Sequence, residues 1–132
     1  MLIRSVIDYL DRTAERIPDK IAVVDETKSL TFTQLREAAR RVASGLSEHG
    51  IFHRPVAVYL EQSAESIVSF LGAAYSGNFY TVLDSKMPAE RLRKITEVLE
   101  PAVILTDEKY FEDAQIFAGG AKNTPPLKPF AS

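Results

Sequence analysis

Two histidines are the residues whose types and spacing most directly suggest a metal site. His49 and His53 lie four residues apart, which on one helix would place both imidazoles on the same face, as in a zinc-binding pair. Gly50, a residue typical of a helix end, lies between them. We therefore interpret both histidines as surface residues of a loop between a helix and a strand, and we expect no metal ligand there.

A glycine-containing segment near the C-terminus could be compared with a phosphate-binding loop. Residues 119–124 read Gly-Gly-Ala-Lys-Asn-Thr, whereas the Walker loop needs two glycines flanking four residues, then Lys-Ser/Thr opening a helix. Here Asn follows the lysine, and prolines follow Thr124. The glycines and prolines of residues 118–132 instead predict a linker or tail. We assign no catalytic, cofactor-binding or metal-binding residue from these patterns.

The composition excludes several classes of function. Among 132 residues, 16 are basic and 18 acidic, so the chain lacks the basic excess with which a protein binds nucleic acid. The absence of cysteine excludes a disulfide framework, a thiolate metal site and a cysteine nucleophile. No apolar run is long enough to span a membrane, and no signal peptide opens the chain, so we expect a cytoplasmic protein.

Helices and strands that alternate along the chain must position any site. Apolar residues at helical spacing predict helices that begin near Ile3, Thr31, Ser63 and Pro88. Short apolar runs predict strands over residues 21–24, 56–60, 79–83 and 102–105, and the first of these lacks alternation, as in a strand covered on both faces. Residues 110–117 fit either a short helix or a strand.

Local signals mark the helix ends. Thr31 and Gln34 have the spacing of a capping box, and Ser63 is suited to cap the next helix. Gly50 and Gly77 follow helical segments at positions where a left-handed residue is common. Pro88 fits a first helical turn. The helix that follows it is expected to direct four apolar side chains inward, namely Leu92, Ile95, Val98 and Leu99.

This order of elements predicts the fold class. Strands that alternate with helices form βαβ units, and right-handed crossovers then give an α/β fold in three layers, with a mostly parallel sheet and helices on both faces. We expect residues 1–117 to form this domain and residues 118–132 to form the Gly/Pro-rich linker or tail. The architecture alone does not specify a function.

Four motifs in order resemble the opening segment of adenylate-forming ligases, the family of acyl-CoA synthetases and nonribosomal peptide synthetase adenylation domains. The similarity runs from about Val6 to Asp107. It includes Ile17-Pro18-Asp19-Lys20-Ile21-Ala22-Val23 and Leu30-Thr31-Phe32-Thr33-Gln34-Leu35, which is similar to the family's Leu-Thr/Ser-Tyr-x-Glu-Leu. It continues through Gly77-Asn78-Phe79-Tyr80-Thr81-Val82-Leu83-Asp84 and through Asp84-Ser85-Lys86-Met87-Pro88-Ala89-Glu90-Arg91-Leu92. In these two motifs Val82 and Ser85 replace prolines of the family pattern.

The resemblance implies that the chain is the N-terminal segment of a longer AMP-dependent ligase. Such a parent activates a carboxylic acid with ATP and Mg²⁺ to an acyl-adenylate and passes it to the thiol of CoA or of a phosphopantetheine carrier. The residues of the second motif, Leu30 to Leu35, resemble those of the amino-acid-activating members and favour an amino acid as the substrate. The family's Lys-containing phosphate loop and its later catalytic residues do not occur in residues 1–132. We therefore expect this segment to bind no cofactor and to be inactive alone, with the remainder of its polypeptide as its partner.

An alternative resemblance is to bacterial receiver domains. Asp25 and Glu26 follow the first predicted strand, and Asp84 is followed by Met-Pro as in a phospho-acceptor loop. Thr106 and Lys128 would then sense the phosphoryl group, and two carboxylates would hold Mg²⁺ beside Asp84. A helix before the first strand and the prolines before Lys128 argue against this alternative, because proline cannot occupy a central strand.

A non-enzymatic alternative is an interaction module. An isolated part of a larger α/β layer exposes apolar surface that other subdomains would cover, and this exposure favours self-association of the segment.

Overall fold

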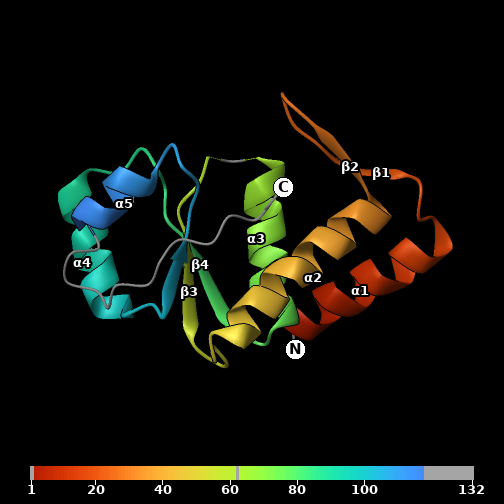
Figure 1. The fold of residues 1–132 in the computed structure, drawn as a ribbon, viewed down its shortest axis with the longest axis horizontal. Helices are drawn as coiled ribbons and strands as arrows, with labels where there is room; N and C mark the ends of the chain where they lie inside the picture. Colours follow the sequence, from red (N-terminus) through yellow and green to blue (C-terminus); the bar gives the residue numbers. More distant parts are fainter. Residues whose placement is uncertain (1, 62, 118–132) are drawn as a thin grey trace.

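A computed structural model describes residues 2–61 and 63–117 as alternating helices and strands (Figure 1). The chain begins with a long helix, continues through a two-stranded hairpin, and then forms βαβ units. In order, the elements are α1 (Leu2–Arg16), β1 (Ile21–Val24), β2 (Ser29–Thr31), α2 (Phe32–Glu48), β3 (Pro55–Val58), α3 (Ala64–Tyr75), β4 (Phe79–Val82), α4 (Ala89–Leu99), β5 (Val103–Leu105) and α5 (Phe111–Phe117).

The central sheet is parallel and has the strand order β4-β3-β5. Val56 of β3 pairs with Tyr80 on one side and with Val103 on the other. The chain therefore moves outward from β3 to β4 through α3 and crosses back to β5 through α4. The expected α/β class is confirmed, with three parallel strands in the described part of the chain.

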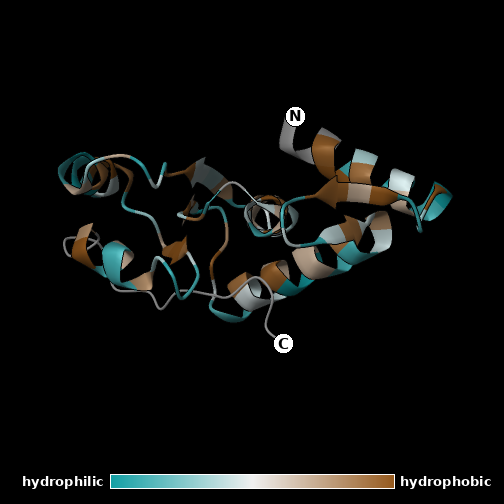
Figure 2. Ribbon diagram, turned by 90° about the horizontal axis from the view of Figure 1, so that it is seen from above, coloured by the Kyte–Doolittle hydropathy of each residue, from teal (hydrophilic) through white to brown (hydrophobic). Residues whose placement is uncertain are grey.

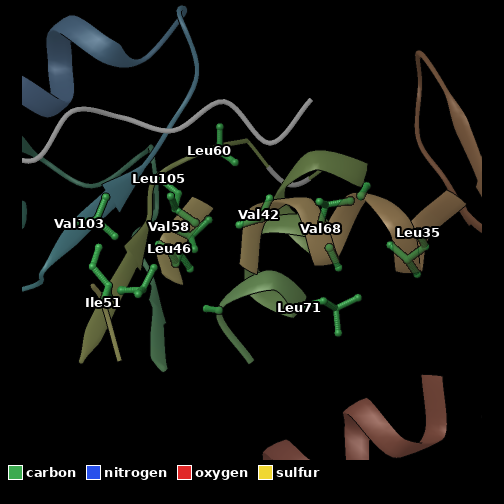
Figure 3. Close-up of a cluster of buried hydrophobic side chains, with 14 of the residues drawn as sticks. Leu35, Val42, Leu46, Ile51, Val58, Leu60, Val68, Leu71, Val103 and Leu105 are labelled. Carbon is green, nitrogen blue, oxygen red and sulfur yellow. The ribbon is translucent and has the colours of Figure 1, made fainter. Parts of the chain in front are cut away.

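Helices cover both faces of this sheet. Val56 and Val58 face a core shared with α2 and α3, of which Figure 3 shows the main side chains, while Ala57 and Ile104 face a second core beside α4 and α5. The alternation follows from the period of two along a strand. Figure 2 shows hydrophobic and hydrophilic residues alternating along the helices, as expected for elements with one buried face.

The first predicted strand is not part of the parallel sheet. β1 pairs with β2 in an antiparallel hairpin, and Ile21 and Val24 are 48% and 71% exposed. The expectation of a strand covered on both faces is therefore wrong. The prediction fails because a tight turn follows Val24 and reverses the chain. Val24 then pairs with Ser29 of β2, whereas a parallel strand would need a crossover helix first.

All four predicted helix starts lie within one residue of the observed ones, and two of the three predicted roles at these starts are confirmed. Thr31 and Gln34 form the capping box of α2, and Ser63 caps α3. Pro88 is the N-cap of α4 and does not occupy its first turn. The inward placement of Val98 is wrong, because α4 packs through a narrower stripe around Leu92 and leaves Val98 87% exposed.

Three further details concern two turns, the last helix and one contact between helices. Gly50 and Gly77 have φ of +70° and +77°, which confirms the left-handed positions after α2 and α3. The ambiguous segment 110–117 contains the helix α5, and its last residue, Phe117, is buried. Helices α2 and α3 approach closely at Gly72, where an added Cβ would lie 2.5 Å from the Val42 Cβ.

Candidate functional site

A groove of about 930 Å³ lies where the parallel strands end. Its walls come from the hairpin turn after β1, the first turns of α3, and the segments that follow β3, β4 and β5. In open parallel sheets, ligands bind at this carboxyl edge, where the connections diverge to the two faces. The lining residues are Val23, Val24, Asp25, Leu60, Glu61, Ser63, Ser66, Ile67, Phe70, Val82, Leu83, Asp84, Ser85, Lys86 and Tyr110.

Asp25 connects the hairpin wall to the helix wall. Its Oδ1 accepts hydrogen bonds from the backbone N–H groups of Thr27 (2.8 Å) and Lys28 (2.9 Å), and its Oδ2 accepts one from Ala64 (2.7 Å). The backbone hydrogen bonds, that from Ala64 first, lower the pKa of Asp25 from 3.8 to about 2. The carboxylate therefore serves as a structural clamp, and both of its oxygens already have donors.

The start of α3 is closed by its own cap. Ser63 Oγ accepts from Ser66 N, Ser66 Oγ accepts from Ser63 N at 3.0 Å, and Asp25 takes the N–H of Ala64. A phosphate bound at a helix N-terminus requires such N–H groups to point at the anion. The first turn of α3 therefore does not fit a nucleotide phosphate.

A small ionic cluster joins the segments after β3 and β5. Glu61 Oε1 accepts from Lys109 Nζ at 2.7 Å and from the Tyr110 hydroxyl at 2.6 Å. The hydrogen bond from Lys109, then that from Tyr110, lowers the pKa of Glu61, and the bond to Glu61 raises the pKa of Lys109 and of Tyr110. Both charged side chains are more than half exposed, so solvent screens the pair and its main effect is to orient Tyr110 at the groove.

The Tyr110 ring packs against aromatic side chains of the second core. The Tyr59 ring makes edge-to-face contacts with Tyr110 and Phe117, with centroid separations of 5.4 Å and 4.7 Å. Tyr59 is 3% exposed, and burial, with the nearby charge of Asp113 as a smaller cause, raises the pKa of its hydroxyl. The wall at Tyr110 is therefore supported by the second core.

The two histidines lie in the connection between α2 and β3. His49 is the C-cap of α2, and its Nδ1 lies 2.8 Å from the carbonyl oxygen of Gly45. His53 adopts a left-handed backbone with φ of 52°. Within residues 2–61 and 63–117, no three or more His, Cys, Asp or Glu side chains gather in a way that could hold a metal ion.

The geometry contradicts the receiver-domain alternative. Such a site needs the acidic end of the first strand beside Asp84 within one parallel sheet, but β1 belongs to the separate hairpin. Asp25 is saturated by backbone donors, while Asp84 Oδ1 accepts from the backbone N–H of Lys86 at 2.9 Å. Thr106 is buried after β5.

Lys128 lies outside the described residues, as do the loop at 119–124 and the expected tail at 118–132.

Among the described residues, those that line the groove do not form a binding site for ATP with Mg²⁺. Its carboxylates at positions 25, 61 and 84 each accept a hydrogen bond from the chain, and the helix start beside Asp25 is capped. What the arrangement provides is a rigid, partly apolar wall formed by three strand ends. None of the described helices is long and apolar enough to cross a membrane.

A parallel α/β unit with a groove at its strand ends is a class of scaffold shared by many enzymes. The family model described as AMP-binding enzyme matches residues 10–128 of this chain. The chain belongs to this family of AMP-binding enzymes, which confirms the resemblance drawn from the four motifs.

Curated relatives support the same assignment. Bacitracin synthase 1 of Bacillus licheniformis is 34% identical over 113 residues, which cover 83% of this chain and 2% of that protein. The D-alanine–D-alanyl carrier protein ligase of Lacticaseibacillus casei (strain BL23) is 34% identical over 104 residues, covering 78% of this chain and 21% of the ligase. The chain thus spans about a fifth or less of the length of these relatives.

Solved structures share the fold. A nonribosomal peptide synthetase, FmoA3, in an α-methyl-L-serine-AMP bound form superposes with a TM-score of 0.83 and 24% identity, covering 93% of this chain and 14% of that one. A benzoate CoA ligase from Burkholderia xenovorans LB400 gives a TM-score of 0.80 and 24% identity over 87% of this chain and 24% of that chain. At this identity the likeness establishes the fold.

Proposed function

We propose that this chain is the N-terminal α/β segment of an AMP-dependent ligase that joins a carboxylic acid to a thiol. In the full-length protein, the acid would react with ATP to give an acyl-adenylate and pyrophosphate, and a thiol would then take the acyl group. The observation that carries this proposal is the family match over residues 10–128, which includes all four motifs. We propose that the parent enzyme works in the cytoplasm, where ATP is available.

The favoured acid is an amino acid. Peptide synthetases and a D-alanine ligase are among the relatives that match most of this chain, at 34% identity each. The acceptor is the thiol of a phosphopantetheine carrier or of CoA, because carrier-protein ligases and a CoA ligase both share this fold.

The segment's own part in this activity is structural. Adenylate formation needs preorganised cations and donors around the charge that develops on the α-phosphate. At the groove, Lys109 pairs with Glu61, the charge of Lys86 also acts on Glu61, and the N–H groups of Ala64 and Ser66 are used by Asp25 and Ser63. We therefore assign ATP and Mg²⁺ to the remainder of the parent polypeptide, which is the segment's principal partner.

A pyrophosphate-release assay tests this division of labour. The 132-residue chain, incubated with ATP, Mg²⁺ and a panel of amino acids, aryl acids and fatty acids, is expected to release no pyrophosphate above a protein-free control. ATP-dependent turnover with any acid that disappears on heat denaturation would overturn the proposed inactivity of the segment.

A further inference from the structure

The outer side of β4 is an open edge of the parallel sheet. Within the described residues β4 pairs only with β3. Phe79 N donates to Arg54 O at 3.0 Å and Leu83 N donates to Val58 O at 2.8 Å. Because backbone groups alternate in direction along a strand, Tyr80 and Val82 direct their N–H and C=O groups away from β3. An exposed row of this kind is a template for another strand.

The side chains at this edge lack the usual protection. Phe79 and Val82 are 58% and 60% exposed and lie on opposite faces of the strand. The four residues Phe79–Val82 include no charge and no proline, which are the features that commonly block pairing between edges. The opposite edge strand, β5, is fully buried in comparison. Of the two edge strands of this sheet, β4 is therefore the more exposed.

We infer that a second copy of this chain pairs with β4 in an antiparallel arrangement about a two-fold axis at Thr81. Tyr80 of one copy then lies opposite Val82 of the other, and the pair exchanges both of its backbone hydrogen bonds. The symmetry operation generates the same pair a second time, so the edge is self-complementary. The result is one continuous sheet across the dimer, with the two Thr81 residues facing each other across the axis.

The positions of charged residues favour a second copy of this chain as the strand that pairs with β4. In this register Asp84 lies opposite Asn78 of the second copy. The Asn78 side chain accepts from the backbone N–H of Arg54 at 3.0 Å, so the exposed Arg54 lies next to it. Each end of the paired strands thus sets Asp84 of one copy opposite the strand position beside which the Arg54 backbone of the other lies. Such pairing fixes register and orientation more than it adds affinity.

Sedimentation equilibrium of the 132-residue chain tests the inference without reference to any ligase activity. The chain is expected to dimerise, and Val82→Lys is expected to raise the dimer dissociation constant at least about tenfold, because a charge would enter the paired edge. Val98→Lys on α4 is the matched control, since Val98 is also exposed, and it should leave the constant unchanged. A chain that remains monomeric, or equal constants for the two variants, would overturn the inference.

A cysteine cross-link gives a second measurement that does not depend on the Lys variants. The chain has no cysteine, so Thr81→Cys introduces a single thiol. Facing residues in a non-hydrogen-bonded antiparallel pair have Cα atoms about 4.5 Å apart, within the range of a disulfide. Mild oxidation is expected to give a covalent dimer with Thr81→Cys and none with Glu97→Cys on α4. Equal cross-linking of both variants, or none with either, would contradict the proposed axis.

Discussion

The Asp25 carboxylate accepts a hydrogen bond of 2.7 Å from the backbone N–H of Ala64, a residue 39 positions later in the sequence. This contact joins the hairpin turn to the first residue of α3. A second link lies beside it, between Lys28 Nζ and Glu65 Oε1 at 3.2 Å. The hairpin wall of the groove is thus held to the helix wall by side chains, and the shape of the groove depends on them.

Asp25→Ala is expected to lower the melting temperature, because three backbone donors lose their acceptor in one change. Amide hydrogen exchange should accelerate at Thr27, Lys28 and Ala64. Glu26→Ala is the matched control, since Glu26 is the exposed neighbour in the same turn. Equal melting temperatures for the two variants would contradict the role assigned to Asp25.

The same carboxylate predicts a pH dependence. The folded-state pKa of Asp25 is depressed to about 2 from 3.8, so its contribution to stability is present above pH 3.8 and is lost as the pH falls toward 2. The difference in unfolding free energy between the native chain and Asp25→Ala should therefore shrink between pH 4 and pH 2. Urea unfolding at several pH values measures it, and a difference that stays constant over this interval would count against the clamp.

Tyr75 should anchor α1 to the rest of the fold. Its hydroxyl donates to Asp11 Oδ1 at 2.6 Å, and Arg40 contacts the same oxygen at 3.2 Å. Tyr75→Phe is expected to lower the free energy of unfolding by about 1 kcal/mol, measured by urea denaturation at pH 7. Tyr9→Phe removes the hydroxyl of an exposed tyrosine on α1 and should change it by less than about 0.5 kcal/mol. Similar losses in both variants would exclude the anchoring role.

Gly72→Ala should destabilise the protein although alanine is the better helix former. The added Cβ would lie 2.5 Å from Val42 Cβ, and overpacking of this kind costs about 1–3 kcal/mol. Val42→Ala removes Cγ1, which lies 2.5 Å from the added Cβ, but keeps the Cβ of residue 42, so the double variant should recover part of the loss. A double-mutant cycle measures the coupling, and additive effects within about 0.3 kcal/mol would show that the helices do not meet as described.

The cluster at the groove mouth predicts an order of pKa changes at Glu61. Its carboxyl pKa lies below the usual value, chiefly through the hydrogen bond from Lys109 and then that from Tyr110, with the more distant charge of Lys86 the smallest contribution. Lys109→Met should therefore raise the pKa of Glu61 more than Lys86→Met does. Carboxyl-carbon NMR titration of the two variants measures the shifts, and the reverse order would contradict the assigned geometry.

The sequence predicts the structure best at helix ends, where a single residue type has one role within its own turn. The caps at Thr31 and Ser63 and the left-handed glycines at 50 and 77 are readable because their hydrogen bonds or dihedral angles involve residues within four positions. The three parallel strands were also readable as short apolar runs, and β3 and β4 each lie between two helices that the sequence predicts. These local signals, taken in order, were enough to identify the family.

Long-range relationships were not readable. The apolar run Ile21–Val24 fits a central strand as well as a hairpin strand, and only its pairing with β2 decides between them. Neither the hydrogen bond that Ala64 donates to Asp25 nor the one that Tyr110 donates to Glu61 has a local signature, because the partners are 39 and 49 positions apart. The groove depends on both contacts and therefore emerges only in three dimensions.

The central claim is that this chain supplies the N-terminal α/β scaffold of an AMP-dependent ligase. A chimera tests it most directly, in which residues 10–117 replace the matching segment of the D-alanine–D-alanyl carrier protein ligase of Lacticaseibacillus casei, of which this chain covers 21%. The measurement is D-alanine-dependent exchange of pyrophosphate into ATP. We predict exchange by the chimera and none by the 132-residue chain alone. A chimera that is folded by circular dichroism but gives no exchange would contradict the claim.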